Sequence, residues 1–392
     1  MELMTKLILK KHCLGRIIAG HPWVFAADIR PVTDAVEDGA QVDVVDADGS
    51  FIGTGFYNSK SKIPVRILSR ESTELDEVFF EQRIREAIDL RKRSGMDAEA
   101  YRVVWSEADF LPGLIIDLYG DICVIQTLTL AMDQRKAMIA RVATELLKAS
   151  VVVERNDVHS RQFEGLPLVK GAIQGVIEGA AKVRLGKMKA SVDVLAGQKT
   201  GVYLDQIENQ VEVGRHCGGR KVLDCFAYQG GFAIHAALGG ASDVWAVDIS
   251  EEAIAVCRKN AILNDCPKIK WKASNVFDEL NTRQRGGEKF DLIILDPPSF
   301  TKSREKVEDA LRGYKEINLR AFKMLEKGGM LATFCCSHHV DDESFRSIVL
   351  DASFDARRIV RLCRTFAQPA DHPIIPAIPE TEYLKGFLFE VV

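Results

Sequence analysis

KVLDCFAYQGGF, at residues 221–232, reads as a short buried strand, an irregular turn and the start of a helix. After Lys221 the strand is apolar except for Asp224 near its end, and the glycine pair Gly230-Gly231 opens the helix. From here the sequence alternates apolar strand segments with amphipathic helix segments. The helices are expected at 231–238, 251–263, 276–285, about 305–326 and 342–354. Five such units in series predict an α/β fold, a doubly wound parallel sheet with helices on both faces.

The sheet is expected to end in an antiparallel hairpin formed by 359–362 and 383–389. The chain before this sheet has a different pattern. Residues 1–72 contain short strand segments broken by Gly, Pro and Asp, which predicts a β-rich domain. Helical periodicity at 77–93 and mixed signals after it predict a small α+β domain over 73–190, which leaves 191–392 for the α/β domain.

Length and charge limit the classes of function. The 392 residues are 47% hydrophobic and 28% charged, which is typical of a globular protein with two or three domains. A net charge of −4 gives no general attraction to a polyanion, so a nucleic-acid partner would need local basic faces. The absence of a long apolar run and of a signal peptide predicts a cytoplasmic protein. Nine cysteines without CxxC spacing favour neither a disulfide framework nor a metal site.

The ends of the first strands indicate a nucleoside site, because ligands of open α/β sheets bind there. The first turn lacks the GxGxxG pattern of pyrophosphate binding, but Asp224 with Gly230 and Gly231 fits a nucleoside without phosphate. The second strand ends at Asp248, which is placed to accept hydrogen bonds from ribose hydroxyls, and the third leads to Asn275, a candidate acceptor for an adenine amine. Further cofactor contacts are expected from the neighbouring Phe226, Tyr228 and Ile249.

Residues 296–300, DPPSF, follow the fourth strand. The proline pair fixes the backbone direction and removes two donors, so Asp296 and the loop after it are held at the sheet edge. In methyltransferases, such an Asp or Asn before two prolines and an aromatic residue commonly faces a base amine; here the aromatic comes one residue late, at Phe300. Asp296 is expected to contact both base and cofactor. Singly, these signals also fit turns, caps and strand terminators, but their order at successive strand ends favours a ligand site.

The fifth strand ends in Cys335-Cys336-Ser337-His338-His339. Adjacent strand residues point to opposite faces, so only one of these cysteines can face a pocket in regular geometry. The cluster has no standard metal-ligand spacing, and no metal is expected. A cysteine at this position can serve as a thiolate nucleophile. The alternative, two small buried cysteines, stays open.

Together the motifs resemble one family over nearly the whole chain. This family is the RlmI type of class I S-adenosylmethionine-dependent methyltransferase, which makes 5-methylcytosine in large-subunit ribosomal RNA and carries an N-terminal PUA domain. Besides the strand-end motifs, the resemblance rests on four segments: 20–25 (GHPWVF), 198–206 (QKTGVYLDQ), 312–315 (RGYK) and 370–373 (ADHP). It implies a PUA domain at 1–72, a Rossmann-like catalytic domain, S-adenosyl-L-methionine as cofactor and 23S ribosomal RNA as partner.

The resemblance also implies the catalytic residues. By position, the cysteine that attacks cytosine is Cys336, and Asp296 orients the base or assists proton transfer. Thiolate addition at C6 makes C5 nucleophilic toward the sulfonium methyl group. Many RNA cytosine methyltransferases carry a second cysteine after the proline of the fourth strand, but this chain has Pro298 and Ser299 there, so product release must use another group. The target cytosine must be unpaired or flipped from its helix.

Two basic runs are candidate contacts for RNA phosphates. The first has five basic residues against Asp193: Lys182, Arg184, Lys187, Lys189 and Lys199. The second is interleaved with acidic residues: Lys302, Arg304, Lys306, Arg312 and Lys315. A solvated face without a partner is the alternative for both.

Other functions remain open from the sequence. The same fold can methylate guanine at N7 or N2 without a covalent step, with the cysteines structural. An RNA-binding module with a vestigial methyltransferase fold is a third hypothesis, and the missing phosphate loop disfavours a nicotinamide dehydrogenase. Apolar strands near the C-terminus allow a homodimer.

Overall fold

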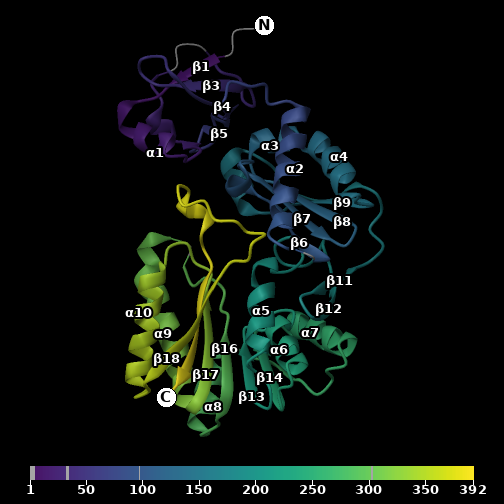
Figure 1. Cartoon of the computed structure of the whole chain (residues 1–392), viewed down its shortest axis with the longest axis vertical. Coiled ribbons are helices and arrows are strands. Elements are labelled where there is room, and N and C mark those ends of the chain that lie inside the picture. The colour runs from purple at the N-terminus through teal and green to yellow at the C-terminus, as the bar shows by residue number, and fades with distance from the viewer. Residues whose placement is uncertain (1–4, 32–34, 97, 302) are drawn as a thin grey trace. The chain divides into compact units, whose positions relative to one another are not determined.

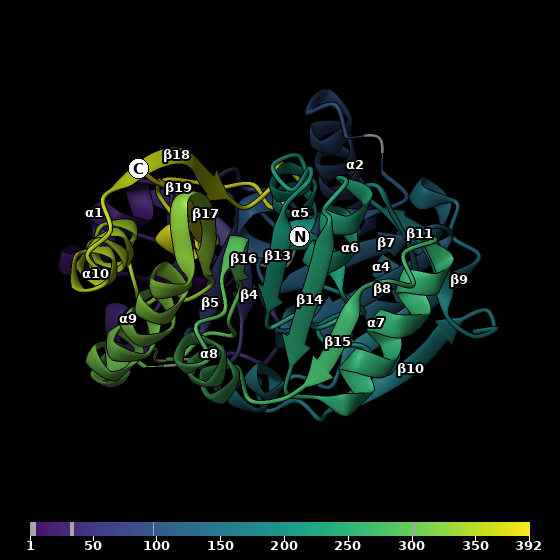
Figure 2. The same ribbon diagram turned by 90° about the horizontal axis from the view of Figure 1, so that it is seen from below.

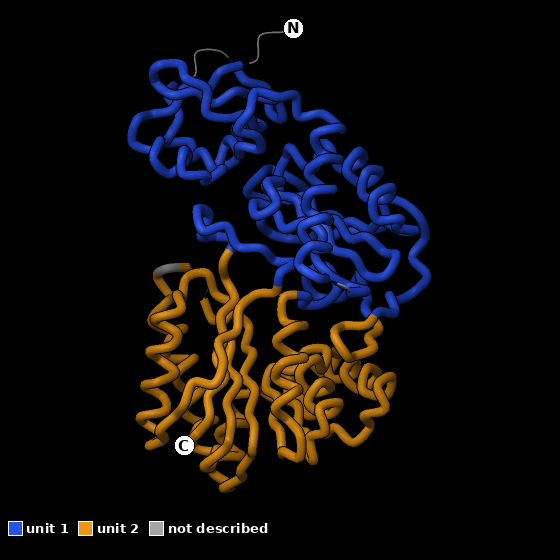
Figure 3. The backbone as a smooth tube through the Cα atoms, in the orientation of Figure 1, with its two compact units in different colours: residues 1–183, 192–204, 370–381 blue, residues 184–191, 205–369, 382–392 orange. Residues whose placement is uncertain are grey.

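The computed structural model describes residues 5–31, 35–96, 98–301 and 303–392 (Figure 1). They divide into two compact units, coloured separately in Figure 3. Unit 1 comprises 1–183, 192–204 and 370–381, and unit 2 comprises 184–191, 205–369 and 382–392. Within the described ranges, no helix is long and apolar enough to cross a membrane.

The N-terminal part of unit 1 is a β-rich domain, as expected. Its elements are β1 (Thr5–Ile8), α1 (Leu14–Ile18), β2 (Trp23–Val24), β3 (Gln41–Val45), β4 (Phe51–Tyr57) and β5 (Val65–Ser69). The strands form one sheet in the order β1-β3-β4-β5-β2. Its apolar core includes Leu7, Ile17, Val44 and Val65, so one helix and the inward strand faces exclude water together.

The rest of unit 1 is an α+β domain around a second sheet. Its elements are α2 (Glu77–Arg93), β6 (Ala100–Trp105), β7 (Leu114–Tyr119), β8 (Ile122–Thr127), α3 (Leu130–Gln134), α4 (Lys136–Leu147), β9 (Val151–Asn156) and β10 (Val169–Gln174). The sheet order is β10-β9-β8-β7-β6, and β8 and β9 pair in parallel. α2 begins where Asp76 accepts a hydrogen bond from the Phe79 N–H (3.0 Å), a standard N-cap. Its buried face packs Phe80 and Ile84 into the core of this domain.

A two-stranded ribbon, β11 (Ala181–Leu185) and β12 (Met188–Val192), contains a boundary between the units. Its residues alternate between buried and exposed, which is the strand period of two. The buried positions are apolar, and the exposed ones include Lys182, Arg184 and Lys189. The ribbon therefore presents a basic face to solvent.

Unit 2 contains the predicted α/β sheet (Figure 2). Its strands are β13 (Lys221–Cys225), β14 (Asp243–Asp248), β15 (Lys270–Ala273), β16 (Phe290–Leu295), β17 (Leu325–Cys335), β18 (Val360–Ala367) and β19 (Lys385–Val391). Its helices are α5 (Ile207–Gly214), α6 (Gly231–Leu238), α7 (Glu251–Leu263), α8 (Val276–Arg285), α9 (Val307–Met324) and α10 (Asp342–Asp355). The strand order is β15-β14-β13-β16-β17-β19-β18.

Pairing in this sheet confirms the sequence prediction. β13 to β17 are parallel to one another, and β18 and β19 form the expected antiparallel hairpin beside β17. α8, α9 and α10 gather beside one part of the sheet, and α6 and α7 beside β14 and β15 (Figure 2). One difference concerns α9, which was expected to reach about residue 326. It ends at Met324, because Leu325 is fully buried and already pairs with Phe290 as the first residue of β17.

Candidate active site

The turn after β13 has an unusual backbone. Phe226, Tyr228 and Gly230 have φ values of 68°, 48° and 86°. These values lie in the left-handed region, which residues other than glycine rarely adopt. The N–H groups of Phe226 and Ala227 both donate to the Val247 carbonyl (2.9 and 3.0 Å), which ties this turn to β14. Backbone strain of this kind clusters at ligand sites, and the turn lies at the carboxyl end of the sheet as expected.

The two glycines have different physical roles. Gly230 is the left-handed residue that caps the start of α6. At Gly231 the constraint is contact, because an added Cβ would lie 2.5 Å from the carboxamide of Gln210 in α5. Gly230 therefore lets the turn close, and Gly231 leaves room for the Gln210 side chain.

Asp224 is fully buried in β13. Its Oδ2 accepts a hydrogen bond from the Ala233 N–H (3.0 Å), and among the described residues its Oδ1 has no hydrogen-bond partner. Burial raises the pKa of this carboxyl well above its ordinary value, and the nearby carboxylates of Asp296 and Asp248 add to the rise. A buried carboxylate oxygen without a donor fits a ligand that brings a cationic amine, as S-adenosylmethionine does.

Asp248 stands at the end of β14, where it orders the same turn. Its Oδ2 accepts from the Tyr228 N–H (2.9 Å) and its Oδ1 from the Ser250 N–H (3.0 Å). Each oxygen of a carboxylate has two lone pairs, so both keep capacity for a ribose hydroxyl. The next residue, Ile249, has 72% of its surface exposed, which leaves an apolar side chain beside the carboxylate.

Asn275 is an exposed residue at the start of α8. Its side-chain oxygen accepts a hydrogen bond from the Phe277 N–H (2.9 Å) and so caps the helix. An adenine amine would compete for the same oxygen, and the predicted acceptor role of Asn275 stays a prediction.

Asp296 and Cys336 lie at the ends of neighbouring strands. Asp296 follows β16, and its Oδ1 accepts a hydrogen bond from Gln206 Nε2 (2.9 Å). Cys336 follows β17, and its thiol donates to the carbonyl of Pro297, the residue after Asp296 (3.7 Å). The predicted nucleophile and the Asp-Pro-Pro loop are therefore in direct contact.

The two adjacent cysteines differ in environment. Cys335 is fully buried in the core that contains Tyr314 and Phe345, and burial raises the pKa of its thiol. Cys336 is only partly buried. Alternation along β17 thus sends Cys335 into the core and leaves Cys336 toward the strand end that carries the site.

The loop after Cys336 is held by a buried lysine that sequence reasoning did not identify. Lys385, the first residue of β19, donates from Nζ to the carbonyls of Ser337 (2.8 Å) and Val340 (2.5 Å). Within this loop, the exposed His338 ring lies 5.3 Å from the ring of Tyr383. Only the position of Lys385 within the expected hairpin strand 383–389 was visible in the sequence.

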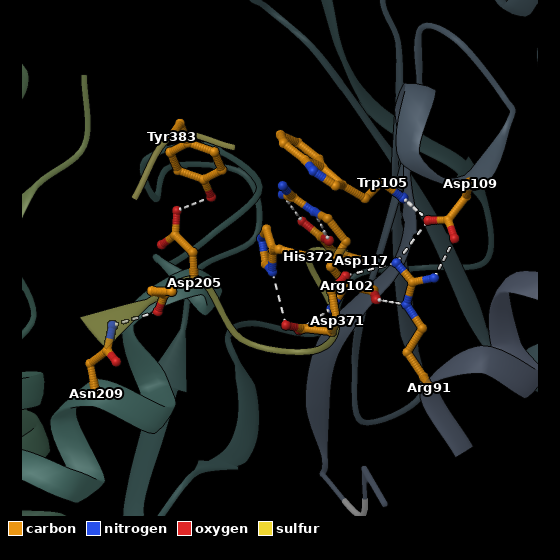
Figure 4. Close-up of polar contacts among 11 residues, drawn as sticks. Arg91, Arg102, Trp105, Asp109, Asp117, Asp205, Asn209, Asp371, His372 and Tyr383 are labelled. Carbon is orange, nitrogen blue, oxygen red and sulfur yellow. Dashed lines mark hydrogen bonds and ion pairs between the residues drawn. The ribbon is translucent and has the colours of Figure 1, made fainter. Parts of the chain in front are cut away.

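Gln206 and its neighbours were also missed as site residues, although they belong to the segment that supports the resemblance. Asn209 donates to Gln206 Oε1 (2.7 Å), so the amide nitrogen of Gln206 faces Asp296. Asp205 is buried, and its Oδ2 accepts a hydrogen bond from the hydroxyl of Tyr383 (2.5 Å; Figure 4). This segment therefore reaches both the Asp-Pro-Pro loop and the chain before β19.

The two basic runs have different surroundings. The side chains of Lys182, Arg184, Lys187, Lys189 and Lys199 are all exposed. In the second run, Lys302 and the side chain of Arg304 lie outside the described residues. Arg312 there pairs with Asp309 (3.2 Å) and Lys315 with Asp355 (2.9 Å), which fits a solvated face. Within the described part of the chain, no group of three His, Cys, Asp or Glu residues could hold a metal ion.

Comparison with known proteins places these residues in a family. Residues 7–70 match the model of a PUA-like domain, and residues 171–378 match that of an S-adenosylmethionine-dependent methyltransferase. A structure from Streptococcus mutans, provisionally assigned as such a methyltransferase, aligns with a TM-score of 0.83 at 20% identity over 99% of this chain and all of that one. A second, SMU.776 in complex with SAH, aligns over the same shares with a TM-score of 0.85 at 20% identity.

Two curated relatives span the full chain. The ribosomal RNA large subunit methyltransferase I of Klebsiella pneumoniae (strain 342) is 37% identical over 100% of this chain and 99% of its own length. The protein of the same name from Escherichia coli O127:H6 is 36% identical over all of both chains. At this identity and coverage, the chain belongs to the S-adenosylmethionine-dependent methyltransferase family of the ribosomal RNA large subunit methyltransferase I proteins, with a PUA-like domain at its N-terminus.

Proposed function

We propose that this enzyme methylates C5 of a cytosine in large-subunit ribosomal RNA through a covalent adduct with Cys336. The observation that carries the proposal is the contact of the Cys336 thiol with the Pro297 carbonyl, beside Asp296, while Cys335 is fully buried. The names of the full-length relatives support ribosomal RNA as the substrate class. A ribosomal RNA substrate also supports the predicted cytoplasmic location.

The cofactor supplies an electrophilic methyl group on a positively charged sulfur. Asp224, with its unpartnered buried Oδ1, would hold the amino group of that cofactor. Asp248 would accept hydrogen bonds from its ribose hydroxyls, and the exposed Ile249 would cover one face of its adenine. Phe226, Tyr228, Gly230 and Gly231 shape the turn around it, and Asn275 and Asp296 complete the predicted set.

Cys336 performs the covalent step in this proposal. Its thiolate adds to C6 of cytosine, and the electron pair of the C5–C6 bond forms a new bond from C5 to the methyl carbon as the methyl–sulfur bond breaks. A base then removes the proton from C5, the C5–C6 double bond forms again, and the C6–sulfur bond breaks to return the thiolate. Asp296 orients the base through its polar edge or takes part in the proton transfer.

The basic ribbon supports contact with RNA. Lys182, Arg184 and Lys189 are exposed on β11 and β12, while the apolar Val183, Leu185 and Met188 are buried, so the charged side chains face solvent. Such a face contacts phosphates without distinguishing the base sequence.

Because Cys336 must reach C6 at the edge of the base, the target cytosine is unpaired or flipped out of its helix. A homodimer stays a prediction that light scattering can test.

Methylation of guanine at N7 or N2 is the main alternative, and it needs no cysteine. The test is nucleoside mass spectrometry of unmodified large-subunit ribosomal RNA after incubation with labelled S-adenosylmethionine and the wild-type, Cys336→Ala or Cys335→Ala protein. We expect label in 5-methylcytidine with the wild type and Cys335→Ala, and none with Cys336→Ala. Label in a guanosine that persists in Cys336→Ala would overturn the proposal and favour the alternative.

A further inference from the structure

Two stretches of chain, 192–204 and 370–381, belong to unit 1, although the residues on both sides of each belong to unit 2. Both stretches lead directly to residues near the candidate active site. The first continues to Gln206, which contacts Asp296, and the second continues to Tyr383. Whatever holds the two stretches in unit 1 therefore acts within a few residues, along the chain, of both Gln206 and Tyr383.

One buried ion pair of the α+β domain, Arg102–Asp117, bonds to both stretches. Figure 4 shows this pair beside Asp371 of the second stretch. Arg102 in β6 donates from Nε and Nη2 to the two carboxylate oxygens of Asp117 in β7 (2.8 and 2.9 Å). Thr200 of the first stretch donates from Oγ1 to Asp117 Oδ2 (2.5 Å). The backbone N–H of Arg102 donates to the Asp371 carboxylate of the second stretch (2.9 Å). All four residues are buried.

A second buried pair supports the first. Arg91 in α2 bonds to both carboxylate oxygens of Asp109 (2.5 and 2.7 Å) and donates to the carbonyl of Asp371 (2.7 Å). It also donates from Nε to the carbonyl of Arg102 (3.0 Å), so the two pairs form one network. Beside it, Asp371 bonds to the ring of His372 (2.9 Å). The ADHP segment, which the chemistry does not use, is thus held in unit 1 by two residues, Arg91 and Arg102, that both bond to Asp371.

Stability alone does not explain so much buried charge. Removing charged groups from water has a large free-energy cost, and well-packed apolar residues are often as stable in the same place. Charge-assisted, bidentate hydrogen bonds instead fix relative positions closely, because both partners have few allowed geometries. That property suits the stretches 192–204 and 370–381, which must keep fixed positions relative to each other.

We infer that the Arg102–Asp117 ion pair is a positioning device for methyl transfer, which holds 192–204 and 370–381 so that Gln206 and Tyr383 meet the site in register. The inference rests on the proposed function for its kinetic readout. Arg102, Asp117 and Thr200 are positioning residues, because no reacting atom touches them. At the other end of both stretches, the Tyr383 hydroxyl donates to Asp205 (2.5 Å), so the stretches are joined there as well.

The test compares three threonine variants of the full-length protein. Thr200→Val removes the hydroxyl that bonds to Asp117 and changes little in volume, and Thr200→Ser keeps the hydroxyl. Thr127→Val is the matched control, because Thr127 is also fully buried in unit 1 and donates to a carboxylate, that of Asp133 (2.9 Å). Each variant is measured for thermal unfolding, for kcat and KM on ribosomal RNA, and for hydrogen exchange of the amides at 205–209.

We expect Thr200→Val and Thr127→Val to lose similar stability, while only Thr200→Val loses about tenfold or more in kcat with little change in KM. Hydrogen exchange at 205–209 should become faster in Thr200→Val alone. In Thr200→Ser, which keeps the hydroxyl, both kcat and the exchange rate should stay near the wild-type values. Equal kcat and equal exchange in the two valine variants would show a merely structural contact and overturn the inference. If the wild type does not methylate RNA, the proposed function fails, and exchange alone decides: faster exchange in Thr200→Val supports the positioning role, and unchanged exchange overturns it.

Discussion

Gln206 Nε2 donates a 2.9 Å hydrogen bond to Asp296 Oδ1, so the carboxylate at the end of β16 is oriented by the segment before α5. Asn209 fixes the direction of that amide, because its own Nδ2 donates to Gln206 Oε1. The two amides therefore act in series on one oxygen of Asp296, its Oδ1. Orientation of the carboxylate is thus a property of two amide side chains outside the Asp-Pro-Pro motif.

Gln206→Glu should make methylation depend on pH in a new way. A protonated glutamic acid can donate the same hydrogen bond to Asp296, whereas an ionised one places two carboxylates in contact, which raises one pKa of the pair. We expect kcat near the wild-type value at low pH and a loss of about tenfold or more as pH rises through that raised pKa. The measurement is a kcat–pH profile.

Gln206→Leu is the control for this profile. It removes the donor without adding a charge, so its loss in kcat should be the same at every pH relative to the wild type. Parallel profiles for Gln206→Glu and the wild type would show that the contact does not orient Asp296 during catalysis.

Asp224 should release a proton when the cofactor binds. Burial raises the pKa of this carboxyl, with Asp296 and Asp248 adding to the rise, so the carboxyl holds its proton to a higher pH than an ordinary aspartate. A cationic ligand favours the ionised form and expels the proton, so affinity rises with pH until Asp224 is ionised in the free enzyme. Calorimetry in buffers of different ionisation enthalpy measures this release.

Asp224→Asn cannot release that proton, and its affinity for S-adenosylmethionine should be weaker and less dependent on pH. Equal proton release by the wild type and Asp224→Asn at the same pH would remove Asp224 from the cofactor site.

The ribbon charges should set the salt dependence of RNA binding. Lys182→Ala combined with Lys189→Ala removes two exposed cations, and the slope of log K against log salt should fall by about 1.5, since each phosphate contact contributes about 0.7 to 0.9. The value of kcat at saturating RNA should not change. The matched control is Arg312→Ala with Lys315→Ala, because acidic neighbours already neutralise both residues. A larger change of slope in this control would place the RNA on the second basic run instead.

Lys385→Met should loosen the loop after Cys336. The change leaves the buried carbonyls of Ser337 and Val340 without a donor, which should lower the free energy of unfolding by about 1–3 kcal/mol and reduce kcat. Lys289→Met is a suitable comparison, because Lys289 also donates to a carbonyl, that of Lys323, but is exposed. Chemical denaturation and kinetics of both variants check the prediction. A loss of stability in Lys385→Met without a loss of kcat would make the lysine purely structural.

Much of the fold could be predicted because its helices carry local signals. The helices at 77–93, 251–263 and 276–285 were predicted to the residue, since Asp76, Ser250 and Asn275 each accept a backbone hydrogen bond at the first turn. The end of α9 was misplaced because the chain passes from Met324 directly into a buried strand. Helical periodicity does not show that Leu325 already pairs with Phe290 of the neighbouring strand β16.

The structure brings together the predicted candidates that stand at or near strand ends, Asp224, Asp248 and Asp296, because topology places those ends at one edge. Contacts made across the sequence had no local signal. Gln206 meets Asp296 across 90 residues, and Arg102 meets Asp371 across 269. No pattern of charge or spacing within either segment identifies its partner.

Covalent trapping measures the role of Cys336 most directly. Large-subunit ribosomal RNA transcribed with 5-fluorocytidine in place of cytidine is incubated with S-adenosylmethionine and the wild-type, Cys336→Ser or Cys335→Ala protein. Fluorine at C5 leaves no proton to remove, so the adduct should persist, and peptide mass spectrometry should place it on Cys336 in the wild type and in Cys335→Ala, with none in Cys336→Ser. An adduct on another cysteine, or methylation of normal RNA with no trapped complex on the fluorinated RNA, would contradict the assignment of Cys336 as the nucleophile.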